Sequence, residues 1–476
     1  MKPGIKNAFQ AEMRAAHSAY AARDWLSAFC HLERAHIVGQ RYFVSHMSTH
    51  WWMLKVAVHR TDWREVRGQL MRMFAVVPGY VFGWVPKGNT GGANVSPLRA
   101  MPIPDDLREP LTGYSVARDM VGRAALLSVL VTLAWASVFL RGVWVQSGES
   151  RTIKAAFNGT CVRLEGLNGA EDIVSDQVQR VAYAVGGDRR SFRGGGPGRA
   201  KIWAIPLDEP AGATRKDLAP PSPETFKSFG ADLYPDPDGN PWLFVANRAE
   251  EHHAIEVFRL KPEGTFEHVR SITSPLLHNP NDLVVLGPDT LLVTLDKEAD
   301  AGTLAEIMEG ALNRPTGKVL LISGKDSMIA ADGLLMANGI ALSPDGKQVF
   351  VGELVGQSVV VFDRDQRTNT LTRNRSIAVG TGVDNLTFAD SGLLYIAGHP
   401  KLLSLALGYQ RREDQPSPSE VVSLDPDTDH IERVFIDEGQ QHAASSVALV
   451  DTVLDRIFIG SAFGPHVSVC DSEAAL

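Results

Sequence analysis

Five short strand-like segments recur along residues 151–476, and each follows a turn that contains an aspartate. The segments are WLFVANR, DTLLVTLD, KQVFVGE, GLLYIAG and DRIFIGSA, and the turns lie near Asp238, Asp289, Asp345, Asp390 and Asp451. Successive turns are 45 to 61 residues apart. A repeat of about 50 residues with several strands is typical of the blades of a β-propeller. Because residues 151–476 have room for six blades, the sequence predicts a mainly β protein with a six-bladed β-propeller. The run AGTLAEIMEGAL, residues 301–312, predicts one helical insertion.

An apolar run, AALLSVLVTLAWASVFL, occupies residues 124–140 and separates the repeats from an unlike first part. The run is uncharged and has about the length of a bilayer core. Arg123 and Arg141 flank it and can reach the lipid headgroups. More than 110 residues precede it, which excludes a cleaved signal peptide. A buried core helix is the alternative, but the length and position favour a transmembrane helix, with its flanks over residues 118–145.

Residues 1–110 predict a small α-helical domain. The segment AYAARDWLSAFCHLERAHIVG spaces its apolar residues by three and four, as a pair of amphipathic helices does. The Gly/Pro-rich stretch PKGNTGGANVSPLRAMPIPDD predicts a loop that folds back on the helices. His46 and His50 lie four residues apart, His36 precedes them, and two histidines at this spacing can share a metal ion. Polar contacts within a helical hairpin are the alternative, which we favour because no acidic partners lie nearby in the sequence.

Charge is distributed unevenly along the chain. Residues 1–110 hold 14 Lys+Arg and 8 Asp+Glu, whereas the whole chain has a net charge of −8. The negative total argues against a nucleic-acid partner. The basic first part favours the cytoplasm for the N-terminus. The sequence therefore predicts a protein that crosses the membrane once, with its acidic part outside.

Three cysteines are too few for a disulfide-rich scaffold and are badly spaced for a zinc site: Cys30, Cys161 and Cys470. Cys161 and Cys470 lie near the two ends of the acidic part. In an oxidising compartment they could close that part. Three free thiols are the alternative at this stage.

Acidic and amide residues precede several apolar runs of the acidic part. If each run is the innermost strand of a blade, the residues at its entry point toward the channel axis. Turn formation is the alternative for any single one, but their recurrence favours a shared site. The first residues of the groups supply two carboxylates and three amide oxygens, which suits calcium: Glu171, Asn281, Asn338, Asp384 and Asn385. Asp172 and Asp282, one residue further, face the opposite way and could hold a second calcium ion.

Residues 158–476 resemble the paraoxonase/arylesterase family on several motifs that agree in order and spacing. The motifs are CVRLEGLNGAEDI, NPNDLVVLGPD, MANGIALSPDGKQVFVGEL, GVDNLTF, AGHP and IGSAFGPHVSVCD. The resemblance implies a six-bladed propeller with two calcium ions (Ca²⁺) in its channel and a disulfide between Cys161 and Cys470. It matches the five residues named above to the ligands of a catalytic calcium. It matches the ligands of a structural calcium to Asp172, Asp282 and the carbonyl oxygen of Ala231.

The sequence departs from the family at two positions. The family usually has a histidine where this chain has Phe229, and a second histidine where it has Arg248. His252 and His253 lie a few residues further along. His399, in AGHP, matches a pocket histidine, with a strand-end hydrogen bond as the alternative.

The function that the resemblance implies is calcium-dependent hydrolysis of a small ester or lactone, as in an arylesterase or lactonase. Calcium would polarise the carbonyl group while water attacks, and Glu171, Asp384 and His399 are the candidate catalytic residues. Losing a general base typically costs about a hundredfold to ten-thousandfold in rate, so the missing histidine pair predicts weak activity. The alternative is a non-enzymatic, calcium-stabilised propeller that binds a ligand or a protein.

Residues 7–107 resemble a small bacterial family of uncharacterised helical proteins, on the stretches HLERAHIVGQ, THWWMLKVAVHR and GWVPKGNTGGANVS. This resemblance implies a bacterial source but no chemistry. The predicted organisation is a helical domain over residues 1–110, a transmembrane segment over 118–145 and a propeller over 151–476. We expect a single-pass protein of the bacterial inner membrane, with its propeller in the periplasm.

Overall fold

The computed structural model describes residues 1–112, 116–193, 199–213, 216–235, 240–249, 253–300 and 303–473. The predicted turn at Asp238 and the residue His252 lie outside these ranges. The chain forms two compact units, Met1–Val138 and Phe139–Leu476. The finer division predicted from the sequence, into residues 1–110, 118–145 and 151–476, stays a prediction.

Helices build the first unit, as the spacing of its apolar residues predicts. They are α1 (Pro3–Ala21), α2 (Trp25–Gly39), α3 (Phe43–His59), α4 (Trp63–Phe82), the short α5 (Asp105–Arg108) and the 3₁₀ turn η1 (Glu109–Leu111). Aspartate side chains cap two of these helices: Asp24 accepts the Ser27 amide at the start of α2, and Asp62 accepts the Glu65 amide at the start of α4. A core of Met13, Ala16, Ala28, Leu32, Ala35, Met53 and Val56 joins α1, α2 and α3.

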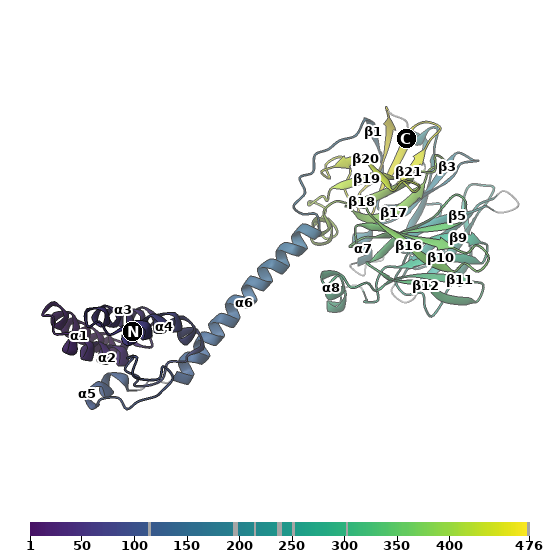
Figure 1. Ribbon diagram of the computed structural model, residues 1–476. Helices are drawn as coiled ribbons and strands as arrows, with labels where there is room; N and C mark the ends of the chain where they lie inside the picture. Colours follow the sequence, from purple (N-terminus) through teal and green to yellow (C-terminus); the bar gives the residue numbers. More distant parts are fainter. Residues whose placement is uncertain are drawn as a thin grey trace. The chain divides into compact units, whose positions relative to one another are not determined.

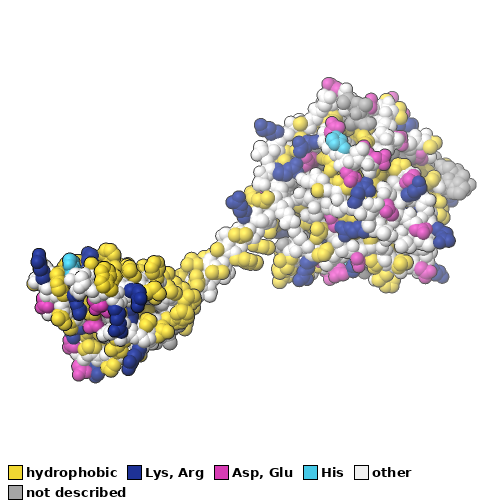
Figure 2. All heavy atoms as spheres, viewed as in Figure 1, with side chains coloured by type: hydrophobic (Ala, Val, Ile, Leu, Met, Phe, Trp, Pro, Cys, Tyr) yellow, Lys and Arg dark blue, Asp and Glu magenta, His cyan; other side chains and the backbone are white. Residues whose placement is uncertain are grey.

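The apolar run lies in α6 (Val116–Gln146). Its 23 residues from Ala124 to Gln146 are long and apolar enough to cross a membrane, and they are not buried inside the protein. Hydrophobic side chains cover this part of α6 in Figure 2. The predicted apolar helix is confirmed, and its exposed side chains argue against the alternative of a buried core helix.

Six antiparallel sheets form the second unit, each of them one blade (Figure 1). Their innermost strands are β2 (Ala170–Asp176), β5 (Ser228–Tyr234), β9 (Pro280–Gly287), β13 (Ala337–Leu342), β17 (Gly382–Phe388) and β21 (Ser445–Asp451). Each inner strand contacts the next one along the chain, and β21 contacts β2, so the ring is closed. The predicted six-bladed β-propeller is therefore confirmed.

The other strands follow outward from the channel in chain order, with β1 completing the last blade. They are β3 (Val181–Gly186) and β4 (Lys201–Pro206); β6 (Trp242–Arg248), β7 (His253–Leu260) and β8 (Phe266–Ile272); β10 (Thr290–Leu295), β11 (Gly317–Ser323) and β12 (Asp326–Leu334); β14 (Gln348–Glu353), β15 (Ser358–Arg364) and β16 (Leu371–Ala378); β18 (Leu394–His399), β19 (Ser419–Asp425) and β20 (His430–Asp437); β22 (Arg456–Ser461), β23 (His466–Ser472) and β1 (Gly159–Glu165).

Short helical segments interrupt the blades. They are α7 (Arg189–Arg193) between β3 and β4, η2 (Pro210–Gly212) after β4, α8 (Leu304–Ala311) between β10 and β11, and the π-helical η3 (Ser404–Tyr409) after β18. The α8 helix confirms the helical insertion predicted in residues 301–312. Apolar side chains of neighbouring blades pack against one another, so the core of the propeller is a series of clusters between sheets.

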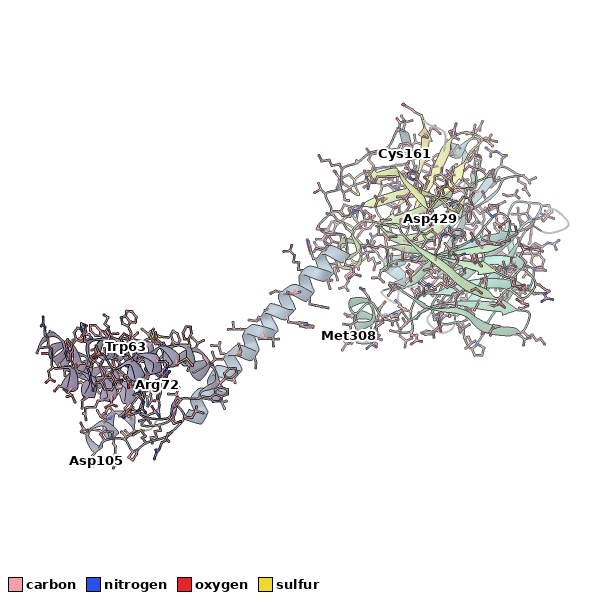
Figure 3. The ribbon with its side chains drawn as sticks, viewed as in Figure 1. Trp63, Arg72, Asp105, Cys161, Met308 and Asp429 are labelled. Atoms are coloured by element: carbon pink, nitrogen blue, oxygen red, sulfur yellow. A yellow bond between two sulfur atoms is a disulfide. The ribbon has the colours of Figure 1, made fainter. Side chains whose placement is uncertain are left out.

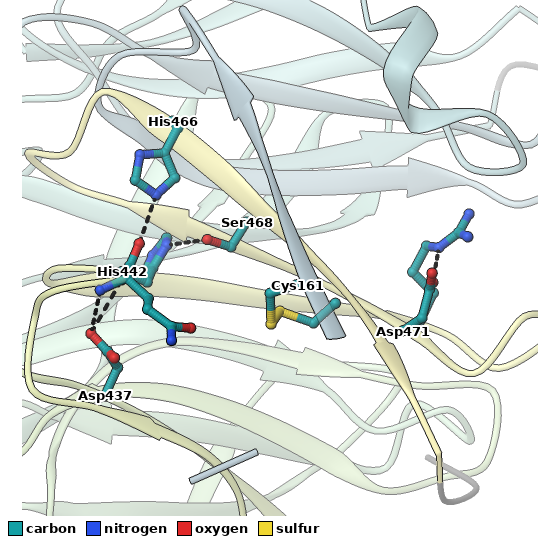
Figure 4. Close-up of a disulfide and its surroundings, with 9 residues drawn as sticks. Cys161, Asp437, His442, His466, Ser468 and Asp471 are labelled. Carbon is teal, nitrogen blue, oxygen red and sulfur yellow. Dashed lines mark hydrogen bonds and ion pairs between the residues drawn. A yellow bond between two sulfur atoms is a disulfide. The ribbon is translucent and has the colours of Figure 1, made fainter. Parts of the chain in front are cut away.

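Strand β1 closes the ring because it pairs with β23, at the other end of the propeller. Cys161 lies opposite Cys470 in this ladder, and a disulfide joins the two residues across a sequence separation of 309 (Figure 4). The predicted disulfide is confirmed, whereas Cys30 in the first unit is a free, exposed thiol.

Candidate metal centre

All six inner strands carry one extra residue close to their first residues. In β17, pairing steps from Val383–Gly398 to Leu386–Ile396, so two residues of β17 face one residue of β18. Such a β-bulge leaves a residue unpaired and redirects side chains. In β17 the two residues are Asp384 and Asn385, both buried. The bulge explains how two consecutive residues can serve one site, which the strict alternation of a regular strand would prevent.

Close approach of the inner strands depends on Gly339, the residue after Asn338. A Cβ atom at this position would lie 2.4 Å from the carbonyl oxygen of Asp384 and 2.6 Å from the Cα of Asn385. Any other residue would force β13 and β17 apart. Glycine therefore lets Asn338 lie next to the bulge residues of β17.

Four buried oxygens of the predicted site have no hydrogen-bond partner among the described residues. They are Glu171 Oε2, Asn281 Oδ1, Asn338 Oδ1 and Asn385 Oδ1. Buried polar groups are normally hydrogen-bonded, so four unpaired acceptors on the inner strands β2, β9, β13 and β17 call for an explanation. The Asn385 side chain is oriented by donating to the Glu171 carbonyl oxygen at 3.1 Å, which leaves its own oxygen free. A hard cation would satisfy all four acceptors, and the donor set fits calcium.

Carboxylates crowd the same region and, among the described residues, outnumber the cations that act on them. Burial, with nearby Asp384 and Asp172, raises the pKa of Glu171, although Arg189 and Arg248 oppose that shift. Burial also raises the pKa of Asp172. Burial and the nearby Asp172 carboxylate raise the pKa of Asp282. Buried carboxylates that repel one another are stabilised by a bound divalent cation. The electrostatics thus agree with the unpaired oxygens.

Three aspartates connect successive blades through backbone amides. Asp172 of β2 accepts the Ala231 amide of β5 at 2.7 Å, and Asp232 of β5 accepts the Val285 amide of β9 at 2.7 Å. Asp282 of β9 accepts the Ile340 amide of β13 at 2.8 Å. Each of these carboxylates also accepts the amide of the residue after it. The first of these bonds joins Asp172 to Ala231, and a Cβ atom at the preceding Gly230 would lie 2.0 Å from Asp282 Oδ1, so the three predicted residues lie close together. The pattern adds Asp232, which the sequence reading missed although Ala231-Asp232 repeats the Glu171-Asp172 arrangement.

His399 is buried at the end of β18 and contacts a candidate ligand. Its Nε2 lies 2.8 Å from Asp384 Oδ2, and its Nδ1 has no partner among the described residues. Because a carboxylate only accepts, Nε2 carries the proton in this contact. His399 therefore orients the Asp384 carboxylate, rather than forming only a strand-end hydrogen bond to the backbone.

An arginine that the sequence reading missed lies beside the site. Arg189 of α7 places Nη2 3.3 Å from Glu171 Oε1, and its guanidinium lies 3.9 Å from the centre of the Phe229 ring. Arg248 covers the same ring at 4.5 Å and holds both oxygens of Asp296 at 2.8 and 2.9 Å. Phe229 and Arg248, the two departures from the family, thus contact each other. No periodic pattern marks Arg189, because it lies in a five-residue helix within a long loop.

His253, proposed as a neighbour of the missing pair, accepts the Asn279 amide at 3.1 Å. Its ring lies 5.4 Å from that of His278, centre to centre. Burial, with nearby Arg248 and His278, lowers its pKa to about 4. None of the described hydrogen bonds or ion pairs of His253 involves a predicted calcium ligand.

Fold and side chains together define a six-bladed propeller whose inner strands carry a buried, oxygen-rich candidate cation centre. The chain belongs to the arylesterase family, whose model matches residues 191–471. This confirms the resemblance seen in the sequence. Residues 3–111 match a second family model, described as a protein of unknown function, DUF3703.

Curated relatives share this propeller part. Serum paraoxonase/arylesterase 2 of Rattus norvegicus is 27% identical over 364 residues, covering 72% of this chain and 98% of that protein. Serum paraoxonase/lactonase 3 of Mus musculus is 28% identical over 324 residues, covering 66% of this chain and 89% of that protein. A solved structure of a putative gluconolactonase, 13% identical with a TM-score of 0.43, covers 68% of this chain and 98% of that one.

Proposed function

We propose that the protein is a calcium-dependent hydrolase of small esters or lactones. The observation that carries this proposal is the set of four unpaired, buried oxygens on four inner strands of the propeller. Membership of the arylesterase family and the names of its curated relatives, which are arylesterases and lactonases, support the same reaction class.

Two calcium ions are proposed, held by neighbouring groups of oxygens. The catalytic ion would be held by Glu171, Asn281, Asn338, Asp384 and Asn385, and the structural ion by Asp172, Asp282 and the carbonyl oxygen of Ala231. Calcium in this position supplies a Lewis acid that polarises the substrate carbonyl and stabilises the oxyanion that develops.

The proton of the attacking water must be taken up by a side chain of the protein. Glu171 is a candidate general base, because burial makes its carboxylate more basic, although coordination to calcium would lower that basicity. Asp384 is the second candidate, with its Oδ2 held by His399. His399 then acts as a positioning residue that fixes the Asp384 carboxylate and can stabilise a proton shared between the two groups.

Phe229 and Arg248 replace the histidine pair of the family, so we expect turnover to be slow. Arg189 and Arg248 bring two guanidinium groups to the Phe229 ring beside Glu171.

Asn338→Ala tests the proposal directly. The purified full-length protein is assayed with calcium against phenyl acetate and a panel of lactones, before and after chelation. We expect the variant to lose turnover at a calcium concentration that still keeps it folded. Asn374→Ala is the matched control, because Asn374 is an exposed amide on the outer strand β16 that bonds Asp363. Hydrolysis of no substrate by the wild type, with no effect of chelation, would refute the enzyme proposal.

A calcium-stabilised binding module is the competing proposal, and the contact of the Phe229 ring with two arginines is the observation that favours it. Such a module uses calcium only to hold its blades together. In that case Asn338→Ala lowers the thermal stability, and no turnover is present to lose. The same pair of variants therefore separates the two proposals.

We further propose a single-pass protein of the bacterial inner membrane with its propeller in the periplasm. The Cys161–Cys470 disulfide supports an oxidising compartment for the propeller, and the exposed thiol of Cys30 supports a reducing one for the first unit. A membrane-impermeant thiol reagent tests this in intact cells. We expect Cys30 to react only after the inner membrane is opened, and labelling of Cys30 before that step would reverse the proposed orientation.

A further inference from the structure

Three histidines form a buried cluster in the helical unit, and none of them belongs to the propeller unit. His36 lies near the end of α2, and His46 and His50 lie one turn apart on α3. Their exposed fractions are 2%, 8% and 1%, and each pair of rings is 4.7 Å apart, centre to centre. Helix packing therefore adds His36 to the pair of histidines that the sequence spacing had singled out.

Hydrogen bonds fix the protonated nitrogen of two of these rings. His36 Nδ1 lies 2.8 Å from the carbonyl oxygen of Asn89, which can only accept, so Nδ1 carries the hydrogen. His50 Nδ1 lies 2.6 Å from Gln69 Oε1. The Gln69 amide nitrogen donates elsewhere, to Glu65 and to the Gly91 carbonyl oxygen, so Gln69 Oε1 accepts from His50. Both Nε2 atoms are consequently lone-pair acceptors.

Protein groups cannot satisfy these acceptors together. His46 Nε2 lies 3.0 Å from His50 Nε2 and can give it one hydrogen. His36 Nε2 then has no partner among the described residues, and neither has His46 Nδ1. Unpaired nitrogens inside a protein are unfavourable. The sequence favoured polar contacts within a helical hairpin. Such contacts account for Nδ1 of His36 and of His50, but not for the unpaired nitrogens.

The arrangement meets the requirements of a metal site. One ligand nitrogen from each ring lies within 4.8 Å of the other two. Tetrahedral zinc with bonds of about 2.0–2.1 Å places its nitrogen ligands roughly 3.3 Å apart, close to the separation of His46 Nε2 and His50 Nε2. The ligand nitrogen of His36 lies within 4.8 Å of the other two and would move closer to them when a metal ion binds. Three neutral imidazoles suit zinc, copper, nickel or cobalt and do not suit calcium or magnesium.

The groups around the rings hold them in a ligand orientation. Histidine ligands of metals usually donate their other nitrogen to a carbonyl or carboxylate oxygen, as His36 does to Asn89 and His50 to Gln69. Gln69 is held in turn by Glu65, whose carboxylate also accepts the Ala93 amide at 2.9 Å. Glu65 therefore places one carboxylate behind Gln69, in the layer of residues that supports the histidines.

A loop closes over the cluster, and its backbone contacts the His36 ring. Gly91 has a φ of +83°, and a Cβ atom there would lie 2.7 Å from carbons of that ring. The Asn89 side chain clamps the loop by donating to the carbonyl oxygens of Ser96 and Arg99 and by accepting the Gly91 amide. Arg72 of α4, labelled in Figure 3, donates to the carbonyl oxygens of Gly92 and Val95. Arg72 is a nearby cation that opposes a metal ion, and Glu65 offsets its charge.

We propose that His36, His46 and His50 bind one divalent transition-metal ion, with Zn²⁺ as the principal candidate, in a buried site of the helical unit. Three protein ligands leave one position of a tetrahedral ion for water or another small ligand. The site is independent of the calcium centre proposed for the propeller, because it uses nitrogen ligands and lies in the other unit.

The test is a titration of the full-length protein, purified without a histidine tag, stripped with a chelator and kept in excess calcium. Co²⁺ is the probe, because its visible absorption reports tetrahedral nitrogen coordination, and Zn²⁺ competes with it. We expect one equivalent of Co²⁺ per chain, displaced by Zn²⁺. His36→Asn and His50→Asn should abolish the absorption, and Gln69→Leu should weaken binding by roughly 10–100-fold because it removes only the outer partner of His50.

His31→Asn is the matched control, since His31 also lies on α2 but pairs with Glu12 outside the cluster. It should bind Co²⁺ as the wild type does, and circular dichroism checks the folding of every variant. Wild-type protein that binds neither Co²⁺ nor Zn²⁺ at micromolar concentration overturns the proposal. Full binding by folded His36→Asn and His50→Asn variants also overturns it, because the ion then lies elsewhere.

Discussion

Removing the Cys161–Cys470 disulfide should destabilise the propeller more than any single side-chain truncation. The bond closes a loop with a sequence separation of 309, and such a cross-link limits the conformations of the unfolded chain. The chain-entropy relation gives about 6 kcal/mol for a loop of this length, and measured effects of disulfides reach about 5 kcal/mol. We therefore expect Cys161→Ala with Cys470→Ala to lower the free energy of unfolding by about 4 to 6 kcal/mol.

The folded ring itself should survive this change. Strands β1 and β23 pair along seven residues, from Gly159–Ser472 to Glu165–His466, so the backbone ladder still joins the two ends. Figure 4 shows the disulfide within this ladder, beside the buried contact between His442 and Ser468. The loss of stability should consequently come from the unfolded state rather than from a disordered blade.

The change in the free energy of unfolding is measured by guanidinium unfolding of the full-length protein in saturating calcium. Pulse proteolysis quantifies the folded propeller at each guanidinium concentration. The unfolded chain of the variant is less compact, so the denaturant dependence (the m-value) should rise as the midpoint falls. Cys30→Ala is the matched control and should change stability by less than about 0.5 kcal/mol, since Cys30 is exposed and free. A loss below about 1 kcal/mol with an unchanged m-value would refute the entropic reasoning.

Three further predictions concern charge, pH and the membrane. Arg189→Gln removes a cation 3.3 Å from Glu171 and should tighten calcium binding about tenfold, or by 1.4 kcal/mol, in a competition titration; weaker binding would contradict this. Burial, with nearby His466, lowers the pKa of His442 to about 3 in the folded protein. Below about pH 6.5 the unfolded chain therefore binds one more proton than the folded chain. The free energy of unfolding then falls as the pH falls, by about 1.4 kcal/mol per pH unit. His442→Gln should remove this slope in unfolding experiments at about pH 7.5 and 5.5, and an unchanged slope would assign it to other groups. Leu133→Arg, in the middle of the apolar helix, should cost about 3 kcal/mol of insertion and reduce the carbonate-resistant membrane fraction; full retention would argue against a membrane span.

The repeat in the sequence predicted the blades because short strand-like segments recur after turns that contain an aspartate. DTLLVTLD and KQVFVGE show this order clearly, and they form β10 and β14, the second strands of their blades. The disulfide could also be predicted from the sequence, because Cys161 and Cys470 match the two ends of a family whose ring is closed in this way.

The bulges and the long-range contacts could not be predicted from the sequence. Alternation along a regular strand sends Asp384 and Asn385 to opposite faces, and the extra residue in β17 is visible only once β18 is paired with it. Arg189 reaches Glu171 through the path of a loop, which no local pattern records. His36 joins His46 and His50 only through the packing of α2 on α3, and the sequence spacing shows the i, i+4 pair alone.

Closing the ring with strands from both ends of the propeller imposes an order on its biosynthesis. Strand β1 is made more than 300 residues before the end of β23, the strand with which it pairs. At about 5–20 residues per second, the ribosome needs roughly 15 to 60 seconds for this length. During that time β1 has no partner and exposes a free strand edge, while the blades from β2 to β20 can already form. A chaperone that acts on the nascent propeller would therefore have its longest-lived target at this first strand, which gains its partner β23 only when synthesis is nearly complete.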